Sequence, residues 1–449
     1  MANSYLNRTQ SSATSDKIGT FSAWIKLSSF SALTDAVFSG HTDSSNRIAL
    51  YFADTLRIYG AIGGSQSVYL VTNRVFQDPS AFYHVVVAWD TTQGTDSNRF
   101  KIYVNGSQIT SFSTTSYPSQ NADVYWNKGT TSIVGARFVS SVDNYFDGYM
   151  SHVSFVDGQQ LAPTVFGETD STSGIWKFKS PSGVTWGNNG FHLKFESSGN
   201  LGLDSSGNSN TFTVNGDGKQ ALDTPTNVSA TLNPLNSNIG ATIPTLSMGN
   251  NRTSNSITNK MQTQYSTLAP ANGKFYCEVK ATAGSVFRIG ISSYNSNQAQ
   301  GSSDTQNRPG QFSEGWGYDK TGTVYKTESS VGSYTAYNTG DIICIALDMT
   351  NKKLYFKRNA NAWENSANPA TGSNGIDISS IPSNTGMAFG AGLESGSVGA
   401  AYADFNFGNG YFGTTAITSA GSNGNGSLFE YDVPSGYYAL NTKNINTYG

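Results

Sequence analysis

The sequence predicts an all-β protein with two antiparallel, jelly-roll-like β-sandwiches joined by a strap rich in Gly, Ser and Asn. The 449 residues include 48 Gly, 25 Phe, 24 Tyr and 7 Trp, whereas only 13% are charged. This many aromatic residues can build hydrophobic cores, which excludes a disordered chain. Short strand-like segments separated by turn residues, without a convincing long amphipathic helix, complete the prediction.

One segment shows the strand pattern clearly. In FKIYVNGSQITSF (residues 100–112), Phe, Ile and Val alternate with Lys and Tyr, so that one face of an extended chain is apolar. Asn105 and Gly106 then tolerate the positive φ angles of a type I′ turn. The segment therefore predicts a β-hairpin.

A similar segment, KKLYFKRNANAW (residues 352–363), lies far along the chain. Because a lone hairpin is only marginally stable in water, two such hairpins indicate two separate sheet domains. Segment 82–90, FYHVVVAWD, is almost continuously apolar and predicts a central strand buried on both faces. Other strand-like segments lie at 20–27, 47–54, 56–63, 67–72, 130–138, 147–157, 274–281, 286–293, 315–326, 341–349, 386–393 and 401–408.

These segments define the expected domains. We expect sandwiches at 1–170 and 236–412, a connecting strap at 171–235 and a C-terminal tail at 413–449. The region around the strap carries single aromatic residues among Gly, Ser and Asn, which is typical of a segment laid across a neighbouring surface. These are Phe166, Trp176, Phe178, Trp186, Phe191, Phe195 and Phe212.

Charge and hydropathy exclude several partners. The net charge is −3 and the pI about 5.8, with no long basic run, so we expect no nucleic-acid binding. No apolar segment reaches the roughly 18 residues that a membrane span needs, so we expect no membrane insertion. The polar N-terminus lacks the apolar core of a signal peptide, and we expect the chain to be made and kept in a cytoplasm unless virus assembly exports it.

Catalytic patterns are weak. The 8 Glu residues do not form the Glu-x-Asp-x-x-Glu pattern that would place paired carboxylates on one strand face. His41, His84, His152 and His192 lack zinc-ligand spacing, and His84 sits in an apolar segment typical of a core histidine. No Gly-x-Ser-x-Gly elbow occurs. We therefore expect a protein that is not an enzyme and requires no cofactor.

The two cysteines, Cys277 and Cys344, both lie in strand-like segments. We expect two buried free thiols, as is usual for cysteines in a cytoplasmic core. A disulfide between neighbouring strands is the alternative, and the spacing does not decide between them.

Calcium is a possible ligand at two short segments. DSSGNSN supplies Asp204, Asn208 and Asn210, and DNYFDG supplies Asp143 and Asp147, all with the oxygen atoms that Ca²⁺ prefers. Neither segment has the spacing of an EF-hand, and the alternative in each case is a structural turn rich in Asp and Asn.

Aromatic residues in loop-like segments are candidates for binding sugars, because pyranose rings stack on Trp and Tyr while polar neighbours bind the hydroxyls. For each of them the alternative is a structural aromatic residue of the core. The candidate ligand-binding residues are Tyr125, Trp126, Trp316, Tyr318, Asp319 and Trp363.

Longer motifs resemble a known family. FYHVVVAWDTTQGTDSNRFKIYVNGSQI and FDGYMSHVSFVDGQQLAPTVFGE resemble the concanavalin A-like (laminin-G-like) sandwich found in structural proteins of marine phages. GKFYCEVKA, GWGYDKTG, GDIICIALDMTNKKLYFKRN and ADFNFG resemble, in order, the strands of a SPRY domain. FEYDVPSGYYALNT is similar to the C-terminal tail of the same phage proteins. The resemblance covers nearly the whole chain.

The resemblance implies a virion protein, made in the host cytoplasm and displayed on a tail fibre, tail or capsid. It implies partners among other virion proteins, a host glycan or surface protein as ligand, and a homo-oligomer. One departure is that laminin-G-like domains commonly have an acidic pair where this chain has Gly148-Tyr149-Met150-Ser151-His152. That difference puts an inherited calcium or ligand role in doubt.

Three functions follow as hypotheses. The first is a tail-fibre adhesin that binds a host glycan or protein through its sandwich loops. The second is a decorating subunit of tail or capsid that binds only other virion proteins. The third, which the missing acidic pattern disfavours, is a glycan-active enzyme.

Overall fold

The computed structural model describes residues 3–30, 35–236, 244–256, 261–293, 308–394 and 400–449. It confirms the all-β, two-sandwich fold class. The chain divides into two compact units, of which unit 1 comprises 1–220 and 224–226, and unit 2 comprises 221–223 and 227–449. Most of the expected strap therefore belongs to unit 1, and the C-terminal tail belongs to unit 2.

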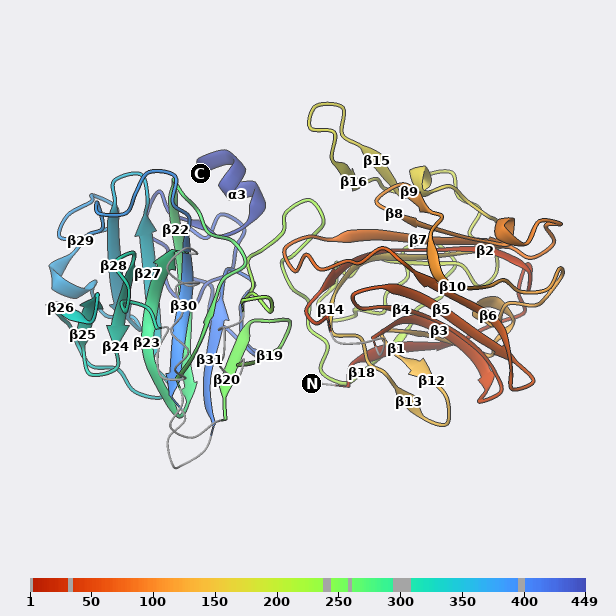
Figure 1. Ribbon diagram of the computed structural model, residues 1–449, viewed down its shortest axis with the longest axis horizontal. Helices are drawn as coiled ribbons and strands as arrows, with labels where there is room; N and C mark the ends of the chain where they lie inside the picture. Colours follow the sequence, from red (N-terminus) through yellow and green to blue (C-terminus); the bar gives the residue numbers. More distant parts are fainter. Residues whose placement is uncertain (1–2, 31–34, 237–243, 257–260, 294–307, 395–399) are drawn as a thin grey trace. The chain divides into compact units, whose positions relative to one another are not determined.

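Unit 1 contains two large sheets (Figure 1). The β4 sheet has, in order, β10 (Phe112–Ser116), β6 (Ser65–Thr72), β5 (Leu56–Ile62), β4 (Asn46–Phe52), β3 (Ala36–Asp43), β11 (Thr131–Val134), β1 (Tyr5–Thr9) and β18 (Thr213–Asn215). The β7 sheet has, in order, β17 (Phe191–Leu193), β14 (Gly148–Asp157), β2 (Ile18–Leu27), β7 (Tyr83–Asp90), β8 (Phe100–Val104) and β9 (Ser107–Ile109). Their strand pairs are antiparallel.

Two small hairpins accompany these sheets in unit 1. They are β12 (Arg137–Phe138) with β13 (Val142–Asp143), and β15 (Gly167–Thr169) with β16 (Trp176–Phe178). Short helical turns also occur at η1 (Asp96–Asn98), α1 (Tyr125–Lys128) and η2 (Pro163–Val165). Tyr125 and Trp126 therefore begin a one-turn helix, and their loop-like sequence was misleading.

Side chains that point alternately to the two faces of each strand build the core of unit 1. On β2, Phe21, Ala23 and Ile25 enter the core between the sheets, so Ser22 and Trp24 lie on the outer face of the β7 sheet. The almost continuously apolar segment predicted as a central strand is β7, buried from Tyr83 to Trp89. The predicted hairpin is also confirmed as β8 and β9, with positive φ at the two residues between them.

Unit 2 repeats the two-layer arrangement. The β27 sheet has, in order, β19 (Thr245–Ser247), β20 (Arg252–Asn255), β31 (Ala401–Asn406), β22 (Lys274–Ala283), β27 (Ile342–Asp348), β28 (Lys353–Arg358) and β29 (Ile376–Asp377), with β34 (Tyr438–Ala439) beside β22. The β23 sheet has, in order, β21 (Met261–Tyr265), β30 (Met387–Glu394), β23 (Ser285–Ser293), β24 (Gly315–Asp319), β25 (Thr323–Lys326) and β26 (Ser329–Ser333). In the described part of unit 2, the other elements are η3 (Glu364–Ser366), β32 (Tyr411–Phe412), β33 (Thr415–Ala416) and α3 (Thr442–Tyr448).

The thiols of unit 2 are both buried and free, as expected. Cys277 lies in the core between the two sheets, whereas Cys344 lies in the cluster on the outer face of the β27 sheet. Because the two side chains are on opposite faces of paired strands, they cannot form the disulfide that the sequence left open.

In each unit, a segment outside the two large sheets covers the outer face of one of them. The first cover, residues 161–186, packs Phe166 and half-buried Trp186 against Val86 and Val156 of the β7 sheet. The second cover, residues 412–439, packs Phe429 and its neighbours against the β27 sheet. Within the described residues, no helix is long and apolar enough to cross a lipid bilayer.

Candidate functional site

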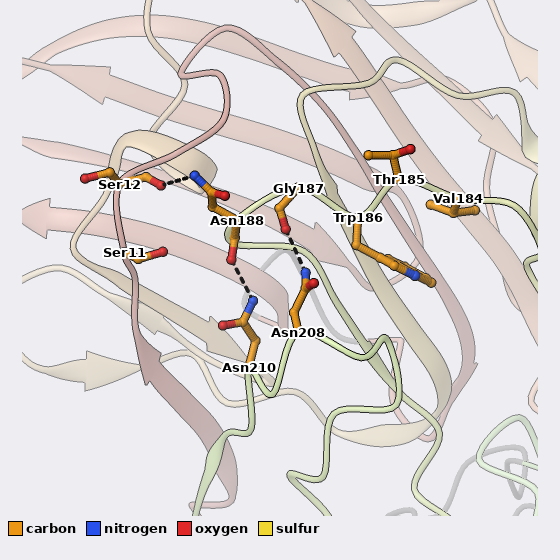
Figure 2. Close-up of a pocket in the computed structure, with 9 residues that line it drawn as sticks. All are labelled: Ser11, Ser12, Val184, Thr185, Trp186, Gly187, Asn188, Asn208 and Asn210. Carbon is orange, nitrogen blue, oxygen red and sulfur yellow. Dashed lines mark hydrogen bonds between the residues drawn. The ribbon is translucent and has the colours of Figure 1, made fainter.

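A hollow in the surface of unit 1 is the main candidate site (Figure 2). Three separate segments build it: the turn after β1, the end of the first cover with the loop before β17, and the loop before β18. The lining residues are Ser11, Ser12, Val184, Thr185, Trp186, Gly187, Asn188, Asn208 and Asn210.

The hollow has two chemically different sides. Figure 2 shows the serines and asparagines on one side and Val184, Thr185 and Trp186 on the other. The Trp186 ring is half-buried because it stacks on His192, with centroids 5.8 Å apart and planes inclined by 20°. The rim of the hollow thus combines amides and hydroxyls with the aromatic side chain of Trp186 and the apolar side chain of Val184, groups that suit the polar edge and the C–H face of a sugar.

Hydrogen bonds from the asparagine amides hold the loops in place (Figure 2). Asn188 Nδ2 donates to the carbonyl of Ser12 at 3.1 Å. Asn208 Nδ2 donates to the carbonyl of Gly187 at 2.7 Å, and Asn210 Nδ2 donates to the carbonyl of Asn188 at 2.9 Å. Each amide nitrogen is thus engaged with the backbone, so the other polar atom of each side chain is an acceptor oxygen.

A buried carboxylate fixes the loops from behind. Asp157, at the end of β14, is only 1% exposed and accepts hydrogen bonds from the backbone N–H groups of Thr14, Ser15 and Asn189 at 2.7, 3.0 and 3.1 Å. Asn127 Nδ2 donates to it at 2.6 Å. One side chain therefore connects the N-terminal segment to the loop that lines the hollow.

Gly187 permits this close approach. Its φ is +73°, and a Cβ atom there would lie 2.0 Å from the backbone oxygen of Asp157. A larger residue would force the loop away from β14.

Asp204 organises the third segment in a similar way. Its carboxylate accepts from the backbone N–H groups of His192, Ser206 and Asn210 at 2.9, 2.8 and 2.8 Å, and from Ser206 Oγ at 2.8 Å. Asn210 Oδ1 accepts from Arg8 at 2.5 Å. The three residues predicted as calcium ligands, Asp204, Asn208 and Asn210, do lie on one loop, but these bonds use them as its structural support.

The second predicted calcium segment is arranged differently. Asp143 forms an ion pair with Arg137, with Nε and Oδ1 2.7 Å apart. Burial raises the pKa of Asp147, which disfavours the charged form that a cation would need. In the part of the chain that the structure describes, no group of three or more His, Cys, Asp or Glu side chains could hold a metal ion.

Most of the predicted aromatic platforms lie in the cores. Trp126 is 0% exposed with its ring centroid 5.2 Å from that of Trp89, and Trp316 and Tyr318 are 1% and 0% exposed. Asp319 is 3% exposed and accepts from the backbone N–H of Thr321. Because a fully buried ring presents no face to a ligand, the prediction of a sugar platform is wrong for Trp126, Trp316 and Tyr318, and Asp319 is equally inaccessible.

Two predicted aromatic residues are half-buried. Tyr125 donates its hydroxyl to Asn46 Oδ1 at 3.1 Å. Trp363 packs edge-on against Tyr355, with centroids 6.4 Å apart, and the Lys357 ammonium lies 5.4 Å from its ring centre. Neither lines the hollow, and as ligand-binding residues both stay predictions.

A buried serine–histidine pair lies on the outer face of the β7 sheet. Ser22 Oγ lies 2.8 Å from His84 Nε2, and Trp176 Nε1 donates to His84 Nδ1 at 2.9 Å. Because Nδ1 accepts that hydrogen bond, the proton of the neutral imidazole lies on Nε2 and points to the serine. Burial also lowers the pKa of His84 to about 3. The imidazole therefore cannot take the serine proton, and this pair supports the fold.

The sequence predicted only part of the hollow. The segment DSSGNSN predicts Asn208 and Asn210 as calcium ligands, and the sequence presents Trp186 only as one of several aromatic residues around the strap. Ser11, Ser12 and Thr185 carry no local pattern that distinguishes them from other polar turn residues.

Comparison with protein families gives one clear match. Residues 2–165 match the concanavalin A-like lectin/glucanases superfamily. Ser11 and Ser12 lie inside the matched region, whereas the other lining residues lie beyond it. A search of the curated proteins gave no match.

SPRY domains are among the similar solved structures. The SPRY domain of human HERC1 is 13% identical, with 38% of this chain and 95% of that chain covered and a TM-score of 0.29. Stonustoxin is 16% identical, with 39% and 27% covered, and the PSpry domain of TRIM65 is 12% identical, with 39% and 89% covered, both at a TM-score of 0.29. Similarities at this level carry no argument about the site.

Proposed function

We propose that this chain is a phage virion protein, displayed on the particle surface, that binds a host carbohydrate through unit 1. The hollow carries the proposal, because it combines acceptor amides and hydroxyls with Trp186 and Val184 on a rigid sandwich. The match of residues 2–165 to a superfamily that includes lectins supports a binding role. The resemblance of the longer motifs to marine phage structural proteins supports the proposal that the chain is part of a virion.

We further propose binding without hydrolysis. The Ser22–His84 pair is buried and has the wrong tautomer for a nucleophile and its base. Purified chain incubated with every glycan that it binds should release no new reducing ends. Release of reducing ends that a Thr185→Ala or Trp186→Ala change abolishes would show that the hollow is a catalytic site.

A glycan array tests the binding role directly. Full-length chain should bind a restricted set of glycans, and Trp186→Ala should reduce that binding at least about tenfold, the loss expected for one stacking aromatic residue. Val331→Ala, an exposed apolar residue of unit 2, is the control and should bind like the unmodified chain. Absence of binding to any glycan would contradict the proposal.

Antibody-gold labelling of purified particles tests the location. Label at tail tips or fibres would agree with an adhesin, whereas label spread over the capsid would favour a decorating subunit that binds other virion proteins. No label on intact particles would contradict the virion role. We also propose a homo-oligomer, because phage fibres are commonly symmetric, and light scattering that gives only monomer mass would contradict it.

A further inference from the structure

The polar atoms around the hollow differ in kind from those of an anion-binding site. None of the nine lining side chains, all within the described residues, is charged. The amide nitrogens of Asn188 and Asn208 donate to backbone carbonyls, so the remaining amide atom of each is an acceptor oxygen. Sugar hydroxyls can donate to such oxygens, whereas carboxylate and sulfate groups have no proton to donate.

Among the described residues, the charged groups behind the hollow are one cation, Arg8, and the carboxylates of Asp204 and Asp157. Arg8 donates to Asn210 Oδ1 at 2.5 Å and to Asn189 Oδ1 at 3.4 Å, and its charge interacts with that of Asp204. Asp157 lies directly behind the loop, and the three backbone N–H groups and one amide that bind it are all neutral. The two carboxylates outnumber the one guanidinium behind the hollow, and this excess of negative charge disfavours a negative ligand.

We infer that the hollow takes a neutral, hydroxyl-rich glycan and rejects glycans that carry carboxylate or sulfate groups. This inference rests on the proposed function and adds the class of ligand to it. It also assigns the recognition to the segment that follows residue 165, since Val184, Thr185, Trp186, Asn188 and Asn208 lie outside the superfamily match.

Thr185 offers the cleanest test because its side chain is exposed at the hollow and lies outside the amide network that holds the loops (Figure 2). Thr185→Lys and Thr185→Glu place opposite charges at the same point. If the ligand is neutral, both variants lose affinity by steric obstruction, and their dissociation constants agree within about threefold. Thr172→Lys and Thr172→Glu, at an exposed position before β16, are the matched controls and should bind like the unmodified chain.

The probes are an array of neutral, carboxylated and sulfated glycans, read at about 50 mM and about 500 mM NaCl, because salt screens charge-dependent binding. The inference predicts binding to neutral glycans that changes less than about twofold between the two salt concentrations. Circular dichroism and thermal unfolding of each variant confirm that it is folded.

The outcomes separate the two claims. Binding confined to acidic glycans, or Thr185→Lys that binds at least about tenfold more tightly than Thr185→Glu, would overturn the neutral class and leave the carbohydrate-binding function standing. Neutral-glycan binding that neither Thr185 variant changes would place the site elsewhere and overturn the inference. No binding to any glycan would overturn both.

Discussion

The first and second covers both shield the outer face of a sheet from water, but they bury different polar side chains. In unit 1, the first cover lays Trp176 and Phe178 on His84 and His152 of the β7 sheet, with ring centroids 5.9 and 3.6 Å apart. In unit 2, the second cover lays Phe429 edge-on against Tyr276 of the β27 sheet, with centroids 4.9 Å apart. Each cover buries aromatic surface that the sheet would otherwise expose to water.

The polar group beneath each cover is what differs. Unit 1 buries neutral imidazoles, and burial lowers the pKa of His84 to about 3 and those of His152 and His192 to about 4. Unit 2 buries Glu278, whose carboxylate accepts from the backbone N–H groups of Glu430 and Tyr431 at 2.9 Å each. Burial raises its pKa to about 7, although its hydrogen bonds oppose that change.

This difference gives the two units opposite responses to pH. A histidine with a lowered pKa favours the unfolded state as the pH falls below about 6.5, because the unfolded chain then binds more protons. A glutamate with a raised pKa stabilises the folded state most below about pH 4.3, and this stabilisation is lost as the pH rises through about 7. Acid should therefore weaken the first cover and strengthen the second.

The largest expected loss of stability comes from a substitution in the second cover. Phe429→Ala removes a fully buried ring and should lower the free energy of unfolding of unit 2 by about 3–5 kcal/mol. Hydrogen exchange at the amides of β22 and β27 measures the loss. Leu428→Ala, at a neighbouring residue that is 38% exposed, is the control and should cost much less. Equal losses in the two variants would show that the second cover is not packed as described.

Glu278→Gln should destabilise unit 2 by about 2–3 kcal/mol at pH 8. Two donors converge on each carboxylate oxygen, so either orientation of the glutamine amide turns its NH₂ group towards two donors. The pH dependence of β22 exchange between pH 5 and 8 should also disappear. Glu196→Gln, at a side chain that is 72% exposed in unit 1, serves as the control and should leave both quantities unchanged. A variant with the original pH dependence would rule out Glu278 as its source.

Acidification should act mainly on unit 1. Between pH 8 and pH 5, the lowered pKa of His84 alone should remove about 2 kcal/mol of stability. Hydrogen exchange at the amides of β7, compared with those of β22 at the same pH, measures the difference. If β22 lost more protection than β7 on acidification, the contrast between the covers would be incorrect.

Trp176→Phe should have the smallest effect and lower the free energy of unfolding of unit 1 by about 1 kcal/mol. The substitution keeps an aromatic ring on His84 but removes the N–H group that donates to His84 Nδ1. Since that hydrogen bond favours the neutral imidazole, the pKa of His84 should rise, as measured by NMR of the ring protons. The pKa of His152, which stacks on Phe178, should stay unchanged and provides an internal reference. An unchanged pKa of His84 would mean that the indole does not control its tautomer.

Local patterns predicted the fold well because strand alternation and turn residues act over short distances. Segment 100–109 folds as expected, since its apolar alternation and Asn105-Gly106 turn need no distant partner. Local patterns gave a wrong prediction for Trp126. The sequence of the short helix α1 resembles a loop, whereas the Trp126 side chain enters the core between the sheets.

The hollow could not be predicted because it depends on contacts between distant segments. Asp157 binds the backbone of Thr14 and Ser15, and Asn210 binds Arg8 and the carbonyl of Asn188. Polar turn residues of this kind recur throughout the sequence. Only the closing of the sandwich brings these three segments together, so their shared role becomes visible only in the structure.

Hydrogen exchange of the full chain with and without its strongest-binding array glycan tests directly whether the hollow of unit 1 is the ligand site. The bound glycan should slow exchange in peptides that contain residues 11–12, 184–188 and 208–210, while exchange in unit 2 stays unchanged. Slowed exchange confined to unit 2, or to strands of unit 1 away from these three segments, would contradict it.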